Sequence, residues 1–409
     1  MCFQSGLAAV VGLMGVAMAA ADAWGAAPER DYRFDKTISR AVLENYLSRA
    51  TTMMDLCTGR GDVNDNIRML KSVGAKFAGR TLYLWGHEKL LPDLLKKARE
   101  SATKVHAADP EMILQAGIFE IVTTQVNDLP VPEHVFREFG LPVEKRSFRY
   151  ADMLFDEGKH RDEWQRGGSV PDITKQETRL WFYFLATAYV DVGMEAIHWG
   201  QVHLIGEKDK GWKEYGDTLS RARKYAAQKA RRHLLLCDAH TQGIVVDGKL
   251  LFDLHAFPLR IKEVAGQPQK AVLGGKHPWG GIYGRSQGGV APSGWSCKSL
   301  PYLVEFDNWS SSGKGGQGGL GGGWVWGYDE MSWFAHQPED YRNEWLRYAH
   351  KWVGDTDPNG YLQMPGSRIL HDPVDGKGWY FANSRASCRD GFNQEETIRQ
   401  IWAGEPSSR

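Results

Sequence analysis

Short apolar runs alternate with amphipathic segments over most of this chain. Apolar runs of roughly four to eight residues are typical of strands buried on both faces, and apolar residues at helical spacing predict helices. The expected strands are residues 81–85, 112–119, 150–154, 195–202, 233–237, 249–255, 302–306 and 360–364. The expected helices are residues 38–57, 64–73, 90–107, 132–139, 175–192, 219–232 and 330–353.

This alternation predicts an α/β fold in which a parallel sheet closes into a single TIM-like (β/α)8 barrel with long loops at its C-terminal face. An open doubly wound sheet is the alternative, but no G-x-G-x-x-G follows the first expected strand. No repeat of fixed period and no linker divides the chain, so residues 28–409 are expected to form one domain.

The first 27 residues are expected to be a secretory signal peptide. Residues 6–21 are apolar, and small residues close this stretch in Ala17-Met18-Ala19, which suits a cleavage region. The first five residues depart from the usual pattern because they contain no Lys or Arg. We therefore expect a secreted or periplasmic bacterial protein with no membrane association once the signal is removed, since no later stretch is long and apolar enough to span a bilayer.

Cysteine usage leaves two interpretations open. Without the signal, Cys57, Cys237, Cys297 and Cys388 remain, and no C-x-x-C indicates a zinc ribbon or a redox site. Cys237 lies in an expected buried strand. Cys297 and Cys388 lie in loop-like sequence and could form a disulfide in an exported protein, or all four could be free thiols.

Net charge and tryptophan content limit the functions that this chain could have. The formal net charge is +0, which excludes a strongly basic nucleic-acid binder. The chain has 16 tryptophans, which favour either a core filled with bulky side chains or a carbohydrate site. Indole faces cover the apolar faces of sugar rings, and binding sites combine aromatic walls with a few polar groups.

Three stretches in the second half of the chain, residues 234–240, 250–255 and 302–309, each begin as a short apolar run and end in acids, histidine or tryptophan. The active site of an α/β barrel forms at such C-terminal strand ends. Side chains alternate along a strand, so Leu303, Glu305 and Asp307 share one direction. Glu305 is the best catalytic candidate, and the alternative is a structural Glu305 paired with a Lys or Arg of a neighbouring strand.

Glycoside hydrolysis requires two carboxyl groups, one protonated and one ionised. The partner of Glu305 could be Glu120, at the end of the second expected strand, or Asp238, at the end of the fifth. Asp307 is a third candidate, although it could instead raise the pKa of Glu305 by repulsion. The predicted catalytic residues are Glu305, Glu120 and Asp238.

Further polar and aromatic residues near these strand ends are expected to bind the substrate. Trp326 and Tyr328 could stack on sugar rings or simply pack in the core, and Asp329 suits the N-cap of the following helix. The predicted substrate-binding residues are His198, Trp199, Gln201, His240, His255, Asp307, Trp309, Trp326 and Tyr328.

Glu305, at the end of the seventh expected strand, resembles the nucleophile of the large clan of retaining barrel glycosidases. In that clan the acid/base glutamate follows an asparagine at the end of strand four, where this chain has Gln201. The chain therefore resembles exported bacterial (β/α)8-barrel proteins of the glycoside hydrolase type. The resemblance implies hydrolysis of a polysaccharide or oligosaccharide, with a carbohydrate as partner and no cofactor.

Two other functions compete with this one. Because Gln201 stands where the clan has its catalytic acid, the chain could be a non-catalytic glycan-binding protein on a barrel scaffold. His198, His203, His240, His255, Asp238 and Asp253 could instead bind the metal of a metal-dependent hydrolase. Their spacing matches neither H-x-H nor H-E-x-x-H, so no metal is expected. No serine lies in a G-x-S-x-G motif, so an α/β-hydrolase triad is unsupported.

Overall fold

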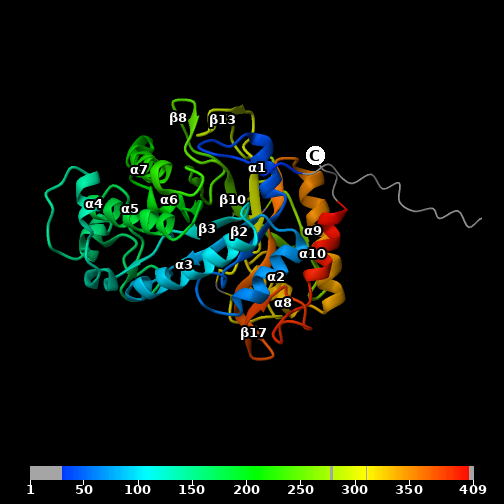
Figure 1. The fold of residues 1–409 in the computed structure, drawn as a ribbon. Coiled ribbons are helices and arrows are strands. Elements are labelled where there is room, and N and C mark those ends of the chain that lie inside the picture. Colours follow the sequence, from blue (N-terminus) through cyan, green and yellow to red (C-terminus); the bar gives the residue numbers. More distant parts are fainter. Residues whose placement is uncertain (1–29, 277–279, 310, 405–409) are drawn as a thin grey trace, which may run out of the picture.

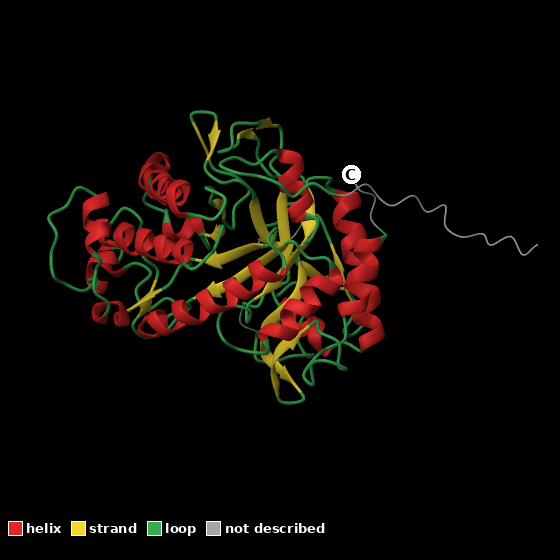
Figure 2. Cartoon of the chain, viewed as in Figure 1, coloured by secondary structure: helices red, strands yellow, loops and turns green. Residues whose placement is uncertain are grey.

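The computed structural model describes residues 30–276, 280–309 and 311–404. The expected signal peptide, residues 1–27, lies outside these residues. In the described part of the chain, no helix combines the length and the apolar character needed to cross a bilayer. Strands occupy the middle of the molecule and helices surround them, with α4, α5 and α7 grouped away from α9 and α10 (Figures 1 and 2).

The largest sheet has seven strands in the order β18-β17-β1-β2-β3-β6-β7, and every neighbouring pair except β17 with β18 is parallel. Its strands, in chain order, are β1 (Ala50–Met53), β2 (Phe77–Tyr83), β3 (Ile113–Gly117), β6 (Ala196–His198), β7 (Leu236–Asp238), β17 (Met364–Val374) and β18 (Lys377–Phe381).

A second parallel sheet has the order β10-β15-β16, formed by β10 (His255–Pro258), β15 (Tyr302–Glu305) and β16 (Gly360–Leu362). It adjoins the first sheet at two edges. β16 ends one residue before β17 begins, and Ala256 of β10 donates its backbone N–H to Ala239, just past β7, at 3.1 Å. The fold is therefore mixed α/β, with parallel strands at its centre.

The remaining elements connect these strands. The α-helices are α1 (Arg40–Leu47), α2 (Val63–Val73), α3 (Leu91–Ala108), α4 (Glu133–Glu138), α5 (Gln176–Asp191), α6 (Val202–Ile205), α7 (Lys213–Lys229), α8 (Glu330–His336), α9 (Glu339–Thr356) and α10 (Glu395–Ala403). The 3-10 helices are η1 (Glu88–Leu90), η2 (Thr124–Asp128), η3 (Tyr150–Met153), η4 (Asp156–Gly158) and η5 (Lys210–Trp212). The short strands are β4 (Val122–Thr123), β5 (Gly168–Ser169), β8 (Val245–Val246), β9 (Lys249–Leu250), β11 (Ile261–Glu263), β12 (Ala271–Leu273), β13 (Gly289–Val290) and β14 (Ser296–Cys297).

The amino ends of the central strands form an apolar layer. The first residues of five strands are buried together and pack against Leu43, Tyr46 and Leu47 of α1. These five residues are Ala50, Phe77, Ile113, Ala196 and Leu236. Burial of such side chains contributes about 1.5–3 kcal/mol each for the larger ones. This end of the strands is a packed core, which leaves the carboxyl ends for polar chemistry.

Several expected elements differ from the structure. The predicted helix 38–57 ends at Leu47, and β1 follows, because Ala50–Met53 is buried along its whole length and carries two threonines that favour a strand. The predicted strand 150–154 is mostly the 3-10 helix η3. The predicted helix 330–353 is two helices, because Gln337 is extended before Pro338, which caps α9.

The expected strand 249–255 is also wrong in position. Lys249 and Leu250 form β9 in a small antiparallel hairpin with β8, and the central strand β10 starts only at His255. Asp253 lies between them, where it accepts hydrogen bonds from the Cys237 backbone and from Arg223, both at 2.9 Å. Cys57, Cys237, Cys297 and Cys388 are free, so Cys297 and Cys388 form no disulfide.

Asp329 caps α8 as expected, since its Oδ1 accepts a hydrogen bond from the Ser332 N–H at 2.8 Å. Burial raises the pKa of Asp329 to about 7. A raised pKa in the folded state stabilises the protein below the unfolded pKa of 3.8, and this contribution is lost as the pH rises toward 7.

Asp329→Asn keeps the capping oxygen but cannot ionise. As the pH rises from 5 to 8, we therefore expect the free energy of unfolding of this variant to increase by roughly 2 kcal/mol relative to that of the wild type. Denaturant unfolding of both proteins at the two pH values measures this difference. An identical pH dependence in both proteins would show that Asp329 ionises normally in the fold.

Candidate active site

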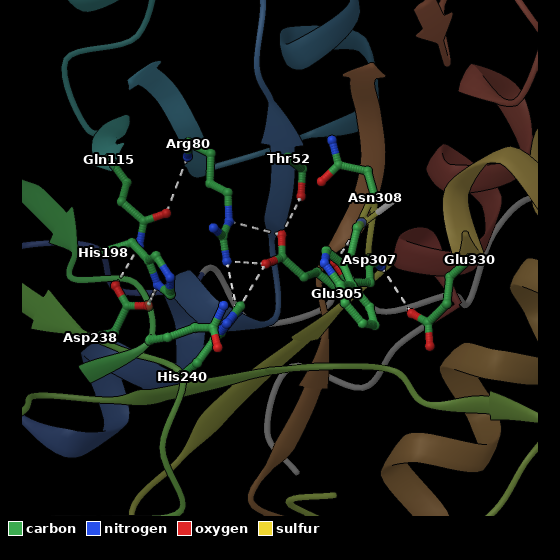
Figure 3. Close-up of polar contacts among 12 residues, drawn as sticks. Thr52, Arg80, Gln115, His198, Asp238, His240, Glu305, Asp307, Asn308 and Glu330 are labelled. Atoms are coloured by element: carbon green, nitrogen blue, oxygen red, sulfur yellow. Dashed lines mark hydrogen bonds and ion pairs between the residues drawn. The ribbon is translucent and has the colours of Figure 1, made fainter. Parts of the chain in front are cut away.

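A cluster of polar side chains lies at or near the carboxyl ends of the central strands (Figure 3). It brings together residues that are far apart in sequence, from seven different strands or the turns that follow them. These residues are Thr52, Arg80, Gln115, His198, Asp238, His240, Glu305, Asn308 and Arg368, and we refer to them as the strand-end cluster.

Glu305, the last residue of β15, is at the centre of the cluster and is only 3% exposed. Arg80 contacts both of its oxygens, with Nε donating to Oε2 at 3.1 Å. Arg368 of β17 donates from Nη1 to Oε2 at 2.8 Å. Burial alone would raise the pKa of Glu305, but the two guanidinium groups hold it well below its usual value. Glu305 is therefore ionised.

Arg80 reaches Glu305 because β2 bulges. Gly79, Arg80 and Thr81 of β2 lie opposite the single residue Gln115 of β3, since Ala78 pairs with Leu114 and Leu82 with Ala116. Arg80 has a φ of 57°, a left-handed conformation that is uncommon for residues other than glycine. The Gln115 side chain fills the bulge, accepting the Arg80 N–H at 3.1 Å. Bulges commonly redirect a side chain next to a functional site.

Asp238, the last residue of β7, lies on the other side of Arg80 and is 1% exposed. Its Oδ1 accepts a hydrogen bond from Gln115 Nε2 at 2.5 Å, and its Oδ2 lies 2.6 Å from His198 Nδ1. Burial raises the pKa of Asp238 to about 7 and lowers that of His198 well below its usual value. Near neutral pH the His198 imidazole is therefore uncharged, and the Asp238 carboxyl is close to the midpoint of its titration.

His240 lies beside Glu305, Arg80 and His198. Its Nε2 lies 3.0 Å from Arg80 Nη2 and 3.7 Å from Glu305 Oε1, and its ring centroid is 4.7 Å from that of His198. The His240 side chain is 21% exposed, against 4% for Glu305 and 2% for Asp238, so it is the group of this set that faces solvent. An ionised carboxyl and a carboxyl that titrates near neutral pH thus belong to one network through Gln115 and Arg80, the arrangement from which acid–base roles are assigned.

Glu120 is not part of this network. It follows β3, and its two oxygens accept hydrogen bonds from the backbone and the side chain of Gln201, both at 2.9 Å. Glu120 therefore orients Gln201, which precedes α6. The structure thus brings Glu305 and Asp238 together and holds Glu120 on Gln201.

His255 does not lie at the carboxyl ends. It is the first residue of β10 and pairs with Tyr302, the first residue of β15, whereas Glu305 pairs with Pro258 at the other end of β10. It is fully buried, with Nδ1 2.8 Å from the Ser286 hydroxyl, and burial lowers the pKa of its imidazole to about 3. The expectation that His255 lies at a carboxyl strand end and binds the substrate beside Glu305 is wrong, because β10 begins at the residue where the strand was expected to end.

Of the remaining predicted substrate-binding residues, Trp199 lies in the core and the others lie after β15. Trp199 is fully buried against Phe182 and Tyr215, so its indole belongs to the core and cannot contact a substrate. In the segment after β15, Asp307 accepts a hydrogen bond from the Trp309 N–H at 3.1 Å. Trp326 donates its indole N–H to the Lys270 carbonyl at 2.7 Å, and the Tyr328 ring stacks on His336.

The pattern of apolar runs did not predict Arg80, Arg368 or Gln115 as site residues. Arg80 precedes the expected strand 81–85 and Arg368 follows the expected strand 360–364. One sequence signal could have found the two arginines, though not Gln115: an arginine beside or within a buried strand requires a buried counter-charge. Within residues 30–276, 280–309 and 311–404, no group of three or more His, Cys, Asp or Glu side chains is arranged to hold a metal ion.

Comparison with known proteins gives similarity to solved structures alone. No family model matches the chain, and no curated protein sequence matches it. The fold is similar to a GH27 β-L-arabinopyranosidase from Geobacillus stearothermophilus (11% identity, 48% of this chain, 50% of that chain, TM-score 0.29). It is also similar to an α-galactosidase from Thermus thermophilus (10% identity, 50% of this chain, 41% of that chain, TM-score 0.31). A third similar structure is the debranching enzyme of Nostoc punctiforme (8% identity, 91% of this chain, 81% of that chain, TM-score 0.43).

These structures are of glycoside hydrolases, the class that the sequence resembles. The chain spans half or less of the first two. At TM-scores below 0.5, the likeness transfers no activity, substrate or residue role to this chain.

Proposed function

We propose that this protein is a glycoside hydrolase that cleaves a polysaccharide or oligosaccharide at the strand-end cluster. The observation that carries the proposal is the pair Glu305 and Asp238, whose pKa values are displaced in opposite directions within one hydrogen-bonded network. Glycosidases require an ionised and a protonated carboxyl at neutral pH, and this cluster supplies both.

In this proposal each group has a defined role. Glu305 carries the negative charge that stabilises, or attacks, the oxocarbenium-like transition state. Asp238, which burial keeps partly protonated near neutral pH, supplies the proton for the leaving oxygen. His240, Gln201, Asp307 and Trp309 orient the sugar, while Arg80 and Arg368 keep Glu305 ionised and fixed in place.

We also infer that the two parallel sheets form one closed (β/α)8 barrel. The pairings that support it run β1-β2-β3-β6-β7, continue through Ala256 of β10 beside Ala239, and return by β15, β16 and β17 to β1. Such a barrel would place all carboxyl strand ends around one mouth, which is where barrel enzymes have their active sites.

A screen against soluble polysaccharides with product analysis tests the activity. We expect release of reducing sugars from at least one neutral polysaccharide, and loss of that release in Glu305→Gln. Reducing-sugar release that Glu305→Gln does not alter would reject the assignment of Glu305.

A non-catalytic glycan-binding protein is the second candidate, and one observation favours it. Glu305 is almost completely buried, and guanidinium groups engage both of its oxygens, as in a structural ion pair. Polysaccharide binding without any product in the same screen would support this second function over hydrolysis.

A further inference from the structure

Two groups of aromatic side chains flank the strand-end cluster, and among these side chains the sequence predicts only Trp309 as a binding residue. The first group consists of Trp85, which follows β2, Phe119, which follows β3, and Trp164, which precedes β5. The Phe119 ring is 5.9 Å from His198, Trp85 is 5.8 Å from Phe119, and Trp164 is 5.3 Å from Trp85, all between ring centroids. This series of rings leads from a cluster residue to the surface, where Trp85 is 42% exposed.

The first group is held in position by polar contacts. The Trp164 indole donates its N–H to the Glu120 carbonyl at 2.7 Å. The Arg80 guanidinium lies over the Phe119 ring at 5.5 Å from the centroid. The two rings that contact Trp85 are therefore held in place by polar contacts, and they support an indole that is 42% exposed.

The second group lies after β15, on the other side of the Arg80–Glu305 pair. Asp307 accepts the backbone N–H of Trp309, and Figure 3 places Asp307 and His198 on opposite sides of that pair. Trp309 is 46% exposed, and its ring lies 4.5 Å from Trp324 at an interplanar angle of 32°. Trp324 lines a cavity of about 280 Å³ together with Lys262 and Glu263.

Trp85 and Trp309 are the exposed tryptophans of the described chain, and every other described tryptophan is at least partly buried. A single exposed apolar side chain is ordinary on a protein surface; what points to a ligand here is that the two exposed indoles lie on either side of one polar cluster. A sugar ring has an apolar C–H face that suits an indole and hydroxyl edges that suit the carboxylates and amides between the two groups.

We propose that Trp85 and Trp309 are two glycan-stacking platforms, and that the ligand is a chain of several sugar rings that crosses the strand-end cluster from one platform to the other. Cleavage would then fall on an internal bond of the chain. The platforms concern binding alone, whereas internal cleavage rests on the hydrolase function proposed above.

Affinity gel electrophoresis with galactomannan, xyloglucan, arabinoxylan, mixed-linkage β-glucan, pullulan and dextran tests the platforms. We expect at least one gel to retard the wild-type protein. Trp85→Ala and Trp309→Ala should each weaken binding to that polysaccharide roughly tenfold or more, and the corresponding Phe variants should lose less. Val245→Ala, which truncates an exposed apolar residue of the β8–β9 hairpin, is the control and should bind as the wild type does.

Unchanged binding in both tryptophan variants, or no retardation in any of the six gels, would overturn the proposal. Loss of binding in only one variant would overturn the two-sided arrangement. Reducing-sugar release, measured in parallel, separates the two proposals. Binding through both tryptophans without release keeps the platforms and rejects hydrolysis, whereas release that neither variant alters rejects the platforms and keeps hydrolysis.

Discussion

Glu305→Gln is expected to lower turnover on the cleaved polysaccharide by about 10³-fold or more. The amide keeps the volume of Glu305 but loses the negative charge and the nucleophilic oxygen, so the transition state loses several kcal/mol of stabilisation, on the order of 4 kcal/mol. The same change leaves Arg80 and Arg368 buried without their counter-charge. We therefore also expect a loss of about 3–5 kcal/mol in unfolding free energy.

Glu195→Gln is the matched control for this loss of stability. Glu195 is 1% exposed and lies between Arg231 and Arg232, with contacts of 2.7 Å to each, but it precedes β6 at the amino end of the strands. Glu195→Gln should destabilise the fold to a similar extent and leave turnover within about twofold of the wild type when both are assayed fully folded. Equal loss of turnover in the two variants would make Glu305 a structural residue.

Asp238→Asn is expected to lower turnover about 10²–10⁴-fold and to remove the alkaline limb of the pH–rate profile. Because burial raises the pKa of Asp238 to about 7, the wild type carries the proton below this pH and loses it above. Its activity should therefore be highest on the acid side of about pH 7 and fall as the pH rises. The profile of kcat/KM between pH 4 and pH 9 measures this limb.

Asp329→Asn controls for the pH effect, because burial raises the pKa of Asp329 to about 7 as well, at the start of α8 and outside the strand-end cluster. This variant should keep the wild-type profile. An alkaline limb that persists in Asp238→Asn would mean that another group supplies the proton, and His240 would be the next candidate because it is the most exposed ionisable member of the cluster.

The sequence predicted those parts of the fold that local patterns encode. β15 and its terminal Glu305 were predictable because an apolar run leads directly into acids, and helices such as α3 and α5 were predictable from their spacing and composition. β1 was not, because Ala50–Met53 directly follows an amphipathic helix and continues its apolar pattern. Tertiary packing decides the conformation of such a short segment.

The same limit applies to the site. The alternative that Glu305 pairs with an arginine was stated from the sequence, but neither arginine could be identified. Arg80 reaches Glu305 through a bulge whose left-handed residue is not a glycine, and Arg368 belongs to a strand that extends beyond its apolar part. Local sequence does not encode pairings between residues 225 positions apart, as for Arg80 and Glu305, or 63 apart, as for Arg368 and Glu305. The His255 error has the same origin, since a shift in strand position exchanged one strand end for the other.

The two buried trios of one glutamate and two arginines have different consequences for sequence divergence. A buried ion pair can often be exchanged for well-packed apolar residues at little or no loss of stability, provided that all partners change together. The Glu195, Arg231 and Arg232 trio could therefore drift to apolar residues in relatives of this chain. The Arg80, Glu305 and Arg368 trio could not, if turnover depends on it, and relatives that have lost it as a unit should be those that no longer cleave glycans.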